Sequence, residues 1–190
     1  MKKTRILAEC GILIALAAVL SLIKVFTLPW GGCITLLGML PVCLISIRHG
    51  LKYGLLSSFV FSCIMLIYGI LLDGLLGWGL TPGMLISCIL LDYIVAYTVL
   101  GIAGIFRSKG MAGIIGGTAL AIFLRFVSHV LSGVYVFAAA GKLWEGFETN
   151  NVWLYSLVYN GAYMLPEMIL TIIGAVIVYK AVFKATKMKI

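Results

Sequence analysis

Charged residues are scarce in this sequence: they make up 11% of its 190 residues, and only six are acidic. A soluble domain carries about 25% charged and roughly 45–50% apolar residues. Here 63% of the chain is hydrophobic, and the mean hydropathy is +1.19. A globule of this size cannot bury so much apolar surface, and disorder requires low hydrophobicity. The composition therefore excludes a soluble and a disordered protein, and lipid is the expected solvent for most of the chain.

Several chemical motifs are also missing. The sequence has no GxxxxGK[ST] phosphate loop, no HExxH metal motif and no GxSxG nucleophile elbow. Its five cysteines are odd in number and never spaced as CxxC, so we interpret them as small apolar residues and not as disulfides or metal ligands: Cys10, Cys33, Cys43, Cys63 and Cys88. We expect no metal and no cofactor.

The net charge of +8 comes from short basic clusters at the edges of apolar runs. Eleven of the 14 Lys and Arg residues lie at the N-terminus, at 48–52, at 107–110 and at the C-terminus. This is the distribution of the positive-inside rule and not that of a nucleic-acid groove. It predicts a multi-pass protein of the cell membrane with both termini cytoplasmic.

Six apolar segments have the length of helices, which are the expected form for a chain crossing lipid. The sequence thus predicts an all-α integral membrane protein, one domain over 1–190, with six transmembrane helices at about 7–28, 33–47, 53–72, 83–106, 111–141 and 153–179. The second segment is short. The first begins with basic residues like a signal peptide, but Glu9 interrupts it, so we expect a retained span.

Four tryptophans lie in or beside the three connections expected on the outer face: Trp30, Trp78, Trp144 and Trp153. Two interpretations are open. They form an interfacial aromatic belt, or they are walls and lids of a pocket that opens outward.

Ionisable and amide side chains inside the spans are costly unless they are paired or face a cavity. Arg125 and Glu167 are candidates for a buried ion pair, and Asn160 for a hydrogen bond between helices. His129 is a core histidine or a ligand contact. Asp92 has no cation near it in sequence, so it requires a basic partner from another helix or a bound cation.

Together these side chains fit a flat, aromatic, cationic ligand with hydrogen-bonding edges. Tryptophan and tyrosine faces attract such a cation, Asp92 supplies the countercharge, and Asn160 and His129 match donor and acceptor edges. A small intramembrane enzyme that uses His129 and Asp92 as acid and base is an alternative, as is a purely structural membrane subunit.

Three stretches resemble the thiamine-specific substrate-binding subunit of energy-coupling-factor (ECF) vitamin transporters. They are Leu90-Leu-Asp-Tyr93 with Leu100-Gly-Ile-Ala-Gly104, His129-Val-Leu-Ser-Gly133, and Tyr155-Ser-Leu-Val-Tyr-Asn-Gly161 with Leu165-Pro-Glu167. The resemblance covers nearly the whole chain. It implies high-affinity capture of thiamine on the outer face, no enzymatic activity, and import driven by a separate module of one transmembrane subunit and two ATPase subunits. A subunit for a related vitamin or a thiamine precursor is the alternative within this class.

The resemblance also implies the site. The thiamine pocket would be lined by Asp92, Tyr93, His129, Gly133, Tyr155 and Asn160, with Trp30 as a lid residue on the first outer loop. Phe137 stands where some relatives have a tryptophan wall, and Trp78 has no counterpart because the region before Asp92 is longer than the family pattern. In the first helix, Gly11 and Ala15 would dock onto the transmembrane subunit.

Overall fold

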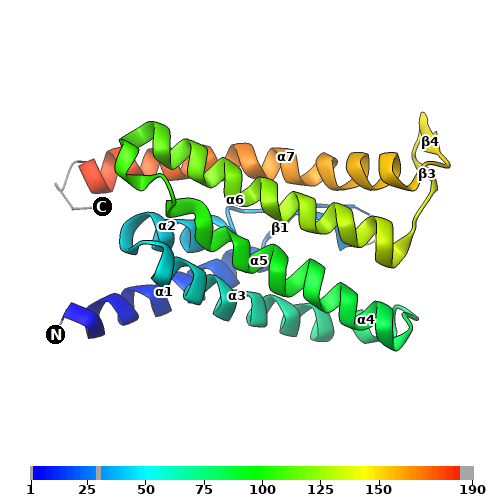
Figure 1. Ribbon diagram of the computed structural model, residues 1–190, viewed down its shortest axis with the longest axis horizontal. Helices are drawn as coiled ribbons and strands as arrows, with labels where there is room; N and C mark the ends of the chain where they lie inside the picture. The colour runs from blue at the N-terminus through cyan, green and yellow to red at the C-terminus, as the bar shows by residue number, and fades with distance from the viewer. Residues whose placement is uncertain (1, 29–30, 185–190) are drawn as a thin grey trace.

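The chain folds into an elongated bundle whose helices follow one long axis (Figure 1). The computed structural model describes residues 2–28 and 31–184. The three simplest helices are α1 (Lys2–Leu22), α2 (Leu40–His49) and α3 (Leu51–Leu71). Three composite rods follow: α4–η3–α5–η4 (Pro82–Cys88, Ile89–Val95, Ala96–Thr98, Val99–Gly104), η5–α6–η6 (Arg107–Lys109, Gly110–Ser132, Gly133–Phe137) and α7–η7 (Val152–Val178, Tyr179–Lys184).

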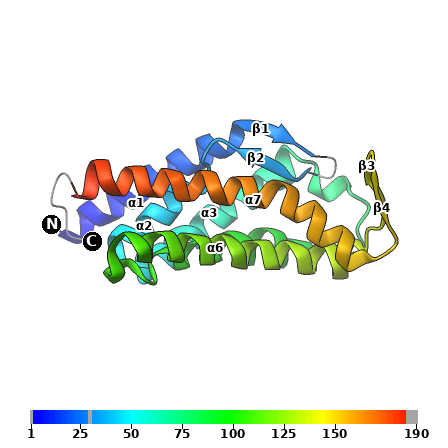
Figure 2. The ribbon, with the colours of Figure 1, turned by 90° about the horizontal axis from the view of Figure 1, so that it is seen from above.

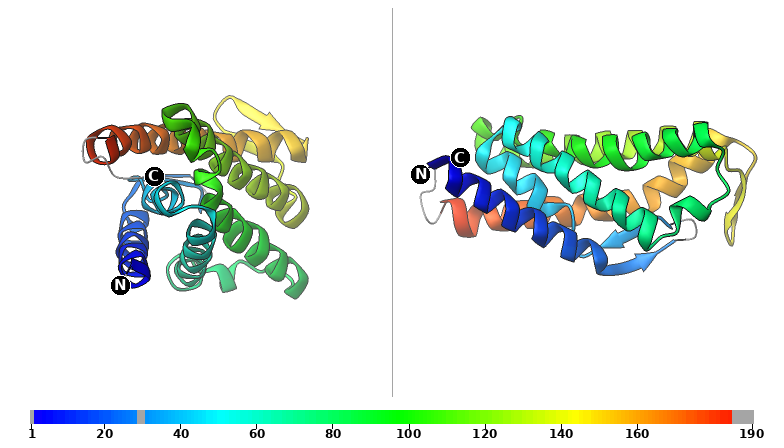
Figure 3. Two further views of the ribbon diagram at one scale, coloured as in Figure 1. Left: turned by 60° about the vertical axis from the view of Figure 1, so that its left-hand side comes forward. Right: turned by 90° about the horizontal axis from the view of Figure 1, so that it is seen from below.

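The non-helical parts are small. One hairpin pairs β1 (Lys24–Thr27) with β2 (Cys33–Thr35), and a second pairs β3 (Gly141–Trp144) with β4 (Phe147–Thr149); both are antiparallel. A short 3-10 turn, η2 (Leu75–Gly77), follows α3. The β1–β2 hairpin lies alongside α7, and the β3–β4 hairpin lies at the end opposite the start of α1 (Figures 2 and 3).

Five helices of the described chain are long and apolar enough to cross a membrane, and α2 is a shorter apolar helix. A mostly helical, multi-pass membrane fold is confirmed, although the described chain also contains two short hairpins that an all-α fold would not have. Many large apolar side chains are exposed along the bundle, for example Ile12, Leu71 and Phe123, as expected where lipid replaces water as the solvent.

Helix α2 is short and lies buried inside the bundle. Its residues from Leu40 to Ile47 are all buried, and it packs against α1, α3 and η4. A helix that is apolar on every side must be surrounded by protein or lipid. Pro41 fits its first turn, where the missing N–H leaves no hydrogen bond unmade.

Small residues let the neighbouring helices approach. A Cβ on Gly117 would lie 2.2 Å from the Ala103 carbonyl oxygen, and one on Gly54 would lie 2.7 Å from the Gly101 carbonyl oxygen. Gly11 on α1 differs, because nothing lies within 4 Å of a Cβ placed there. Gly54 of α3 and Gly117 of α6 therefore serve internal packing, whereas Gly11 faces outward.

The structure changes three of the predicted segment boundaries. The segment expected over 7–28 leaves the helix at Leu22 and continues as β1, and the segment expected from 33 begins as β2, so that α2 starts only at Leu40. The segment expected to end at 141 leaves the helix after Phe137, where Ala138 takes a left-handed φ of 45°. The first two changes share a cause: Val25, Phe26 and Ile34 are as apolar as helix residues but favour strands, and hydropathy does not distinguish the two. The third segment ends in three alanines and a glycine, which are also apolar, and the left-handed Ala138, the first of them, ends the helix.

The basic clusters gather at one end of the bundle. The start of α1, the α2–α3 connection, η5 and the end of η7 all lie at the left in Figure 1, while the α3–α4 connection and β3–β4 lie at the right. At the basic end, Glu9 accepts hydrogen bonds from Arg5 and Arg48 and contacts His49 Nε2 at 3.0 Å. The interruption of the first segment by Glu9 is thus explained by cationic neighbours.

Candidate functional site

A cavity of about 570 Å³ lies between the β1–β2 hairpin and the helices η3, α6, η6 and α7. Seven of the eight side chains or backbones expected at the ligand site line it: Asp92, Tyr93, His129, Gly133, Phe137, Tyr155 and Asn160. Trp30, the expected lid residue, lies outside the described residues. The volume is within the range of small-molecule sites, about 300–1,000 Å³.

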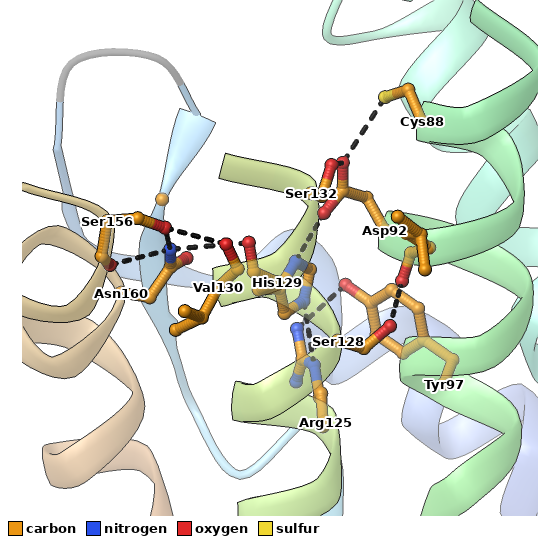
Figure 4. Close-up of polar contacts among 12 residues, drawn as sticks. Cys88, Asp92, Tyr97, Arg125, Ser128, His129, Val130, Ser132, Ser156 and Asn160 are labelled. Carbon is orange, nitrogen blue, oxygen red and sulfur yellow. Dashed lines mark hydrogen bonds and ion pairs between the residues drawn. The ribbon is translucent and has the colours of Figure 1, made fainter. Parts of the chain in front are cut away.

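An acid–imidazole pair stands in the wall of this cavity (Figure 4). His129 Nδ1 lies 2.8 Å from Asp92 Oδ1, and both side chains are mostly buried. Ser132 donates its hydroxyl to the other carboxylate oxygen of Asp92, and Cys88 donates its thiol to the same oxygen at 3.3 Å. Asp92 therefore has the partner from another helix that its sequence context required, and that partner is His129.

The backbone widens where these side chains sit. Asp92 lies in the π-helical stretch η3, and the π-helical stretch η6 begins directly after Ser132. π-Helical turns are rare and frequently mark functional sites. Their wider turn alters the direction in which successive side chains leave each helix, and at this level of the bundle both helices face the cavity.

The predicted ion pair between α6 and α7 is present. Arg125 Nη1 lies 3.5 Å from Glu167 Oε2, with both side chains at most 8% exposed. Arg125 also donates to the Tyr97 hydroxyl at 3.0 Å, and its guanidinium lies 4.3 Å from the centre of the Tyr97 ring. The second carboxylate oxygen of Glu167 accepts from both the backbone N–H (2.6 Å) and the hydroxyl (2.5 Å) of Thr35 in β2. This network fastens the hairpin to the two helices beneath it.

Asn160 is fixed largely by its own neighbours. Its amide nitrogen donates to the Ser156 carbonyl oxygen at 2.9 Å and to the His129 carbonyl oxygen at 3.4 Å, and its oxygen accepts from the Tyr163 hydroxyl at 2.7 Å. The amide is 4% exposed. A carboxamide oxygen has two lone pairs, so one acceptor position of Asn160 remains for a ligand.

Aromatic rings form the other walls. The rings of Tyr155 and Tyr159 stack with an interplanar angle of 12°, and Trp78 packs against Phe137 with ring centres 6.1 Å apart. Trp78 lines the cavity, so it joins Phe137 in the wall, a position that the family pattern did not reveal. Trp144 and Trp153 instead pack on Phe147 and Tyr135, away from these rings.

An ion pair at the rim was not anticipated from the sequence. Lys24 Nζ of β1 lies 2.8 Å from Asp73 Oδ1 at the end of α3, and both residues line the cavity. The hydrogen bond to the Asp73 carboxylate raises the pKa of Lys24 above its usual value. The main-chain oxygen of Asp73 also accepts from Trp78 Nε1 at 3.0 Å. The only sequence signal was an acid in an outer connection, with no indication of its partner 49 residues away.

Gly11 and Ala15 lie on the exposed face of α1, away from the cavity lining. They share this face with exposed Ile12 and Val19.

These features define a multi-pass membrane protein with a ligand-sized cavity enclosed by aromatic rings and an acid–imidazole pair. The chain belongs to the family described as thiamine transporter protein (Thia_YuaJ), whose model matches residues 7–187. This is a family of transporters and not of enzymes.

Individual relatives agree with this assignment. The chain is 30% identical over 178 residues to the thiamine transporter ThiT of Bacillus subtilis, covering 86% of this chain and 84% of that one. It is 27% identical to ThiT of Lacticaseibacillus paracasei over 154 residues, 72% and 68% of the two chains. A solved structure of ThiT from Listeria monocytogenes superimposes with a TM-score of 0.75 at 25% identity, covering 97% of this chain and 98% of that one.

Proposed function

We propose that this protein captures thiamine on the outer face of the membrane with high affinity and hands it to an ECF-type energising module for import. The observation that carries the proposal is the Asp92–His129 pair set among aromatic rings in a cavity of small-molecule size. The names of the curated relatives, both thiamine transporters, support the choice of ligand.

Thiamine fits the chemistry of the cavity. It has a permanently positive thiazolium ring and a flat aminopyrimidine with donor and acceptor edges. Asp92 provides the countercharge, and Trp78 and Phe137 provide faces for a cationic ring. His129 and Tyr155 contact the ligand by stacking, while the remaining lone pair of the Asn160 oxygen accepts from the exocyclic amine.

The orientation follows from charge. We assign the basic end of the bundle to the cytoplasm, as the positive-inside rule requires, and count α2 as the sixth membrane helix. Both termini are then cytoplasmic, and the rim formed by Asp73 and Trp78 opens outward. All six helices share one buried core, so residues 1–190 act as a single domain.

Energy must come from other subunits. The sequence has no phosphate-binding loop, and the family resemblance supplies a transmembrane subunit and two ATPase subunits as partners. We assign the outward face of α1 around Gly11 and Ala15 to the contact with the transmembrane subunit. Open space at Gly11 permits the close helix approach that small residues allow in membranes.

Calorimetric titration of the purified protein tests the proposal. Thiamine should bind, thiamine phosphate and the isolated pyrimidine half should bind more weakly, and no ligand should be chemically altered. Trp78→Leu should weaken thiamine binding, whereas the matched variant Trp153→Leu, at a residue outside the cavity lining, should leave it unchanged. Tighter binding of the pyrimidine half than of thiamine would assign the protein to a precursor, and turnover of the ligand would identify an enzyme instead.

A further inference from the structure

Six acidic, basic or histidine side chains line the cavity, and their pairing determines its net charge. Lys24 pairs with Asp73 at the rim and Arg125 pairs with Glu167 at the buried end. Each of these pairs is neutral. The remaining two are Asp92 and His129, so the net charge of the cavity depends on whether His129 carries one proton or two.

The hydrogen bonds around His129 decide this. Arg125, one helical turn earlier on α6, directs its Nε–H to His129 Nε2 at 3.4 Å. An arginine side chain is always protonated in proteins and can only donate, so Nε2 of His129 must present a lone pair. The single ring proton then lies on Nδ1, which faces the Asp92 carboxylate at 2.8 Å. An imidazolium would place two N–H groups against each other at Nε2.

Asp92 is surrounded by donors in a matching way. Ser132, Cys88 and His129 Nδ1 all donate to its two oxygens. An ionised carboxylate is an acceptor only, so this arrangement suits the charged form.

We propose that Arg125 is a positioning residue for the ligand site, which holds His129 neutral and thereby leaves the charge of Asp92 available to a cation. This inference rests on the proposed capture of thiamine. It adds the reason why the site prefers a cationic ligand. Within the described residues, the cavity carries a net charge of −1, equal and opposite to the single fixed charge of a thiazolium.

The other groups that face His129 fit this assignment. Tyr163 of α7 contacts the imidazole edge-on with ring centres 6.3 Å apart, and it directs its hydroxyl to Asn160. Tyr97 of α5 accepts from Arg125 Nη2, a different nitrogen from the one that faces His129. Glu167 balances the charge of Arg125, so the cation next to His129 does not cancel Asp92.

The direct test is the nitrogen spectrum of the imidazole. The chain has two histidines, so His49→Gln leaves His129 as the only signal in protein labelled with ¹⁵N-histidine. Without ligand at pH 7, one nitrogen should be of the pyridine type and should be Nε2. Two pyrrole-type nitrogens, or a proton on Nε2, would overturn the proposal whether or not thiamine binds.

Binding as a function of pH gives the second readout. Between about pH 8 and pH 6, thiamine affinity should stay constant in the wild type. Arg125→Lys keeps the positive charge beside Glu167 but loses the Nε–H donor to His129 Nε2, so that donor no longer keeps a second proton off the ring. A second ring proton on His129 would cancel the charge of Asp92, so thiamine should bind the variant measurably more weakly at pH 6 than at pH 8.

Two controls separate this inference from the proposed function. Arg107→Lys, which alters an arginine that bonds the Arg48 carbonyl oxygen at the basic end, should show the flat profile of the wild type. A thiamine analogue with a neutral ring should give flat profiles throughout. If Arg125→Lys does not fold, the double variant Arg125→Met/Glu167→Gln serves in its place: it removes both charges together, and the glutamine oxygen still accepts from Thr35. A flat thiamine profile in the variant refutes the role of Arg125, whereas failure of the wild type to bind thiamine refutes the proposed function.

Discussion

Replacing Asp92 by asparagine tests the countercharge in the cavity. The substitution keeps the size of the side chain, and its oxygen still accepts from His129 Nδ1. Its new N–H₂ group faces the Ser132 hydroxyl, which can rotate to accept. The fold should therefore survive, and the empty protein should gain slightly in stability because a mostly buried carboxylate is lost.

The loss of affinity can be worked out from burial. The Asp92 side chain is 16% exposed, and a ligand bound in the cavity would cover it further. Removing one partner of a buried ion pair costs about 3–5 kcal/mol. At about 1.4 kcal/mol per decade, thiamine should bind roughly two to three decades more weakly.

The assay is calorimetry with two ligands, thiamine and an analogue whose thiazolium is replaced by an uncharged ring. Asp92→Asn should weaken the binding of thiamine far more than the binding of the neutral analogue. His129→Ala and Asn160→Ala should weaken both alike, because these residues act through stacking and hydrogen bonds. Glu148→Gln, on exposed β4, is the control for loss of one acid. An equal loss for both ligands with Asp92→Asn would refute the countercharge, and Asp92 would then serve only to hold His129.

Three further predictions concern orientation, docking and packing. With the native cysteines replaced, a cysteine at Glu148 should react with an impermeant reagent from outside and one at Lys109 should not; the reverse pattern would invert the topology. Gly11→Trp should abolish uptake in cells while leaving thiamine binding in detergent nearly intact, and equal loss of both would assign the position to internal packing. Gly69→Ala places a Cβ 2.3 Å from the Tyr93 hydroxyl, so it should lower stability by about 1–3 kcal/mol and displace a cavity wall, measurable as a lower melting temperature and weaker thiamine binding.

The sequence predicted those features that depend on local pattern. Apolar runs indicated the membrane helices, and the cost of ionisable groups in lipid singled out Asp92, His129, Arg125 and Glu167. The Arg125–Glu167 pair was itself predicted and is present. These inferences succeed because a charged side chain in a membrane must be paired or face a cavity in any fold that the chain adopts.

What could not be predicted depends on contacts between distant segments. Trp78 and Phe137 are 59 residues apart and meet only because the connection between η2 and α4 lies beside η6 at one end of the bundle. Lys24 and Asp73 likewise pair across the rim. The β1–β2 hairpin was missed because its strands are extensions of apolar runs, which hydropathy assigns to the neighbouring helices.

The two edges of the β1–β2 hairpin are attached with unequal strength. On the β2 side, Thr35 makes two hydrogen bonds to a buried carboxylate, and Gly32 donates its N–H to the Tyr159 hydroxyl at 2.9 Å. On the β1 side, the described contact with α3 is the Lys24–Asp73 pair, which is about one-third exposed and of a kind worth about 0–1 kcal/mol. The hairpin is thus held by buried hydrogen bonds along β2 and by a solvent-exposed ion pair along β1. High ionic strength would weaken the exposed Lys24–Asp73 pair before the buried Thr35–Glu167 hydrogen bonds. The side of the cavity next to α3 would therefore open first.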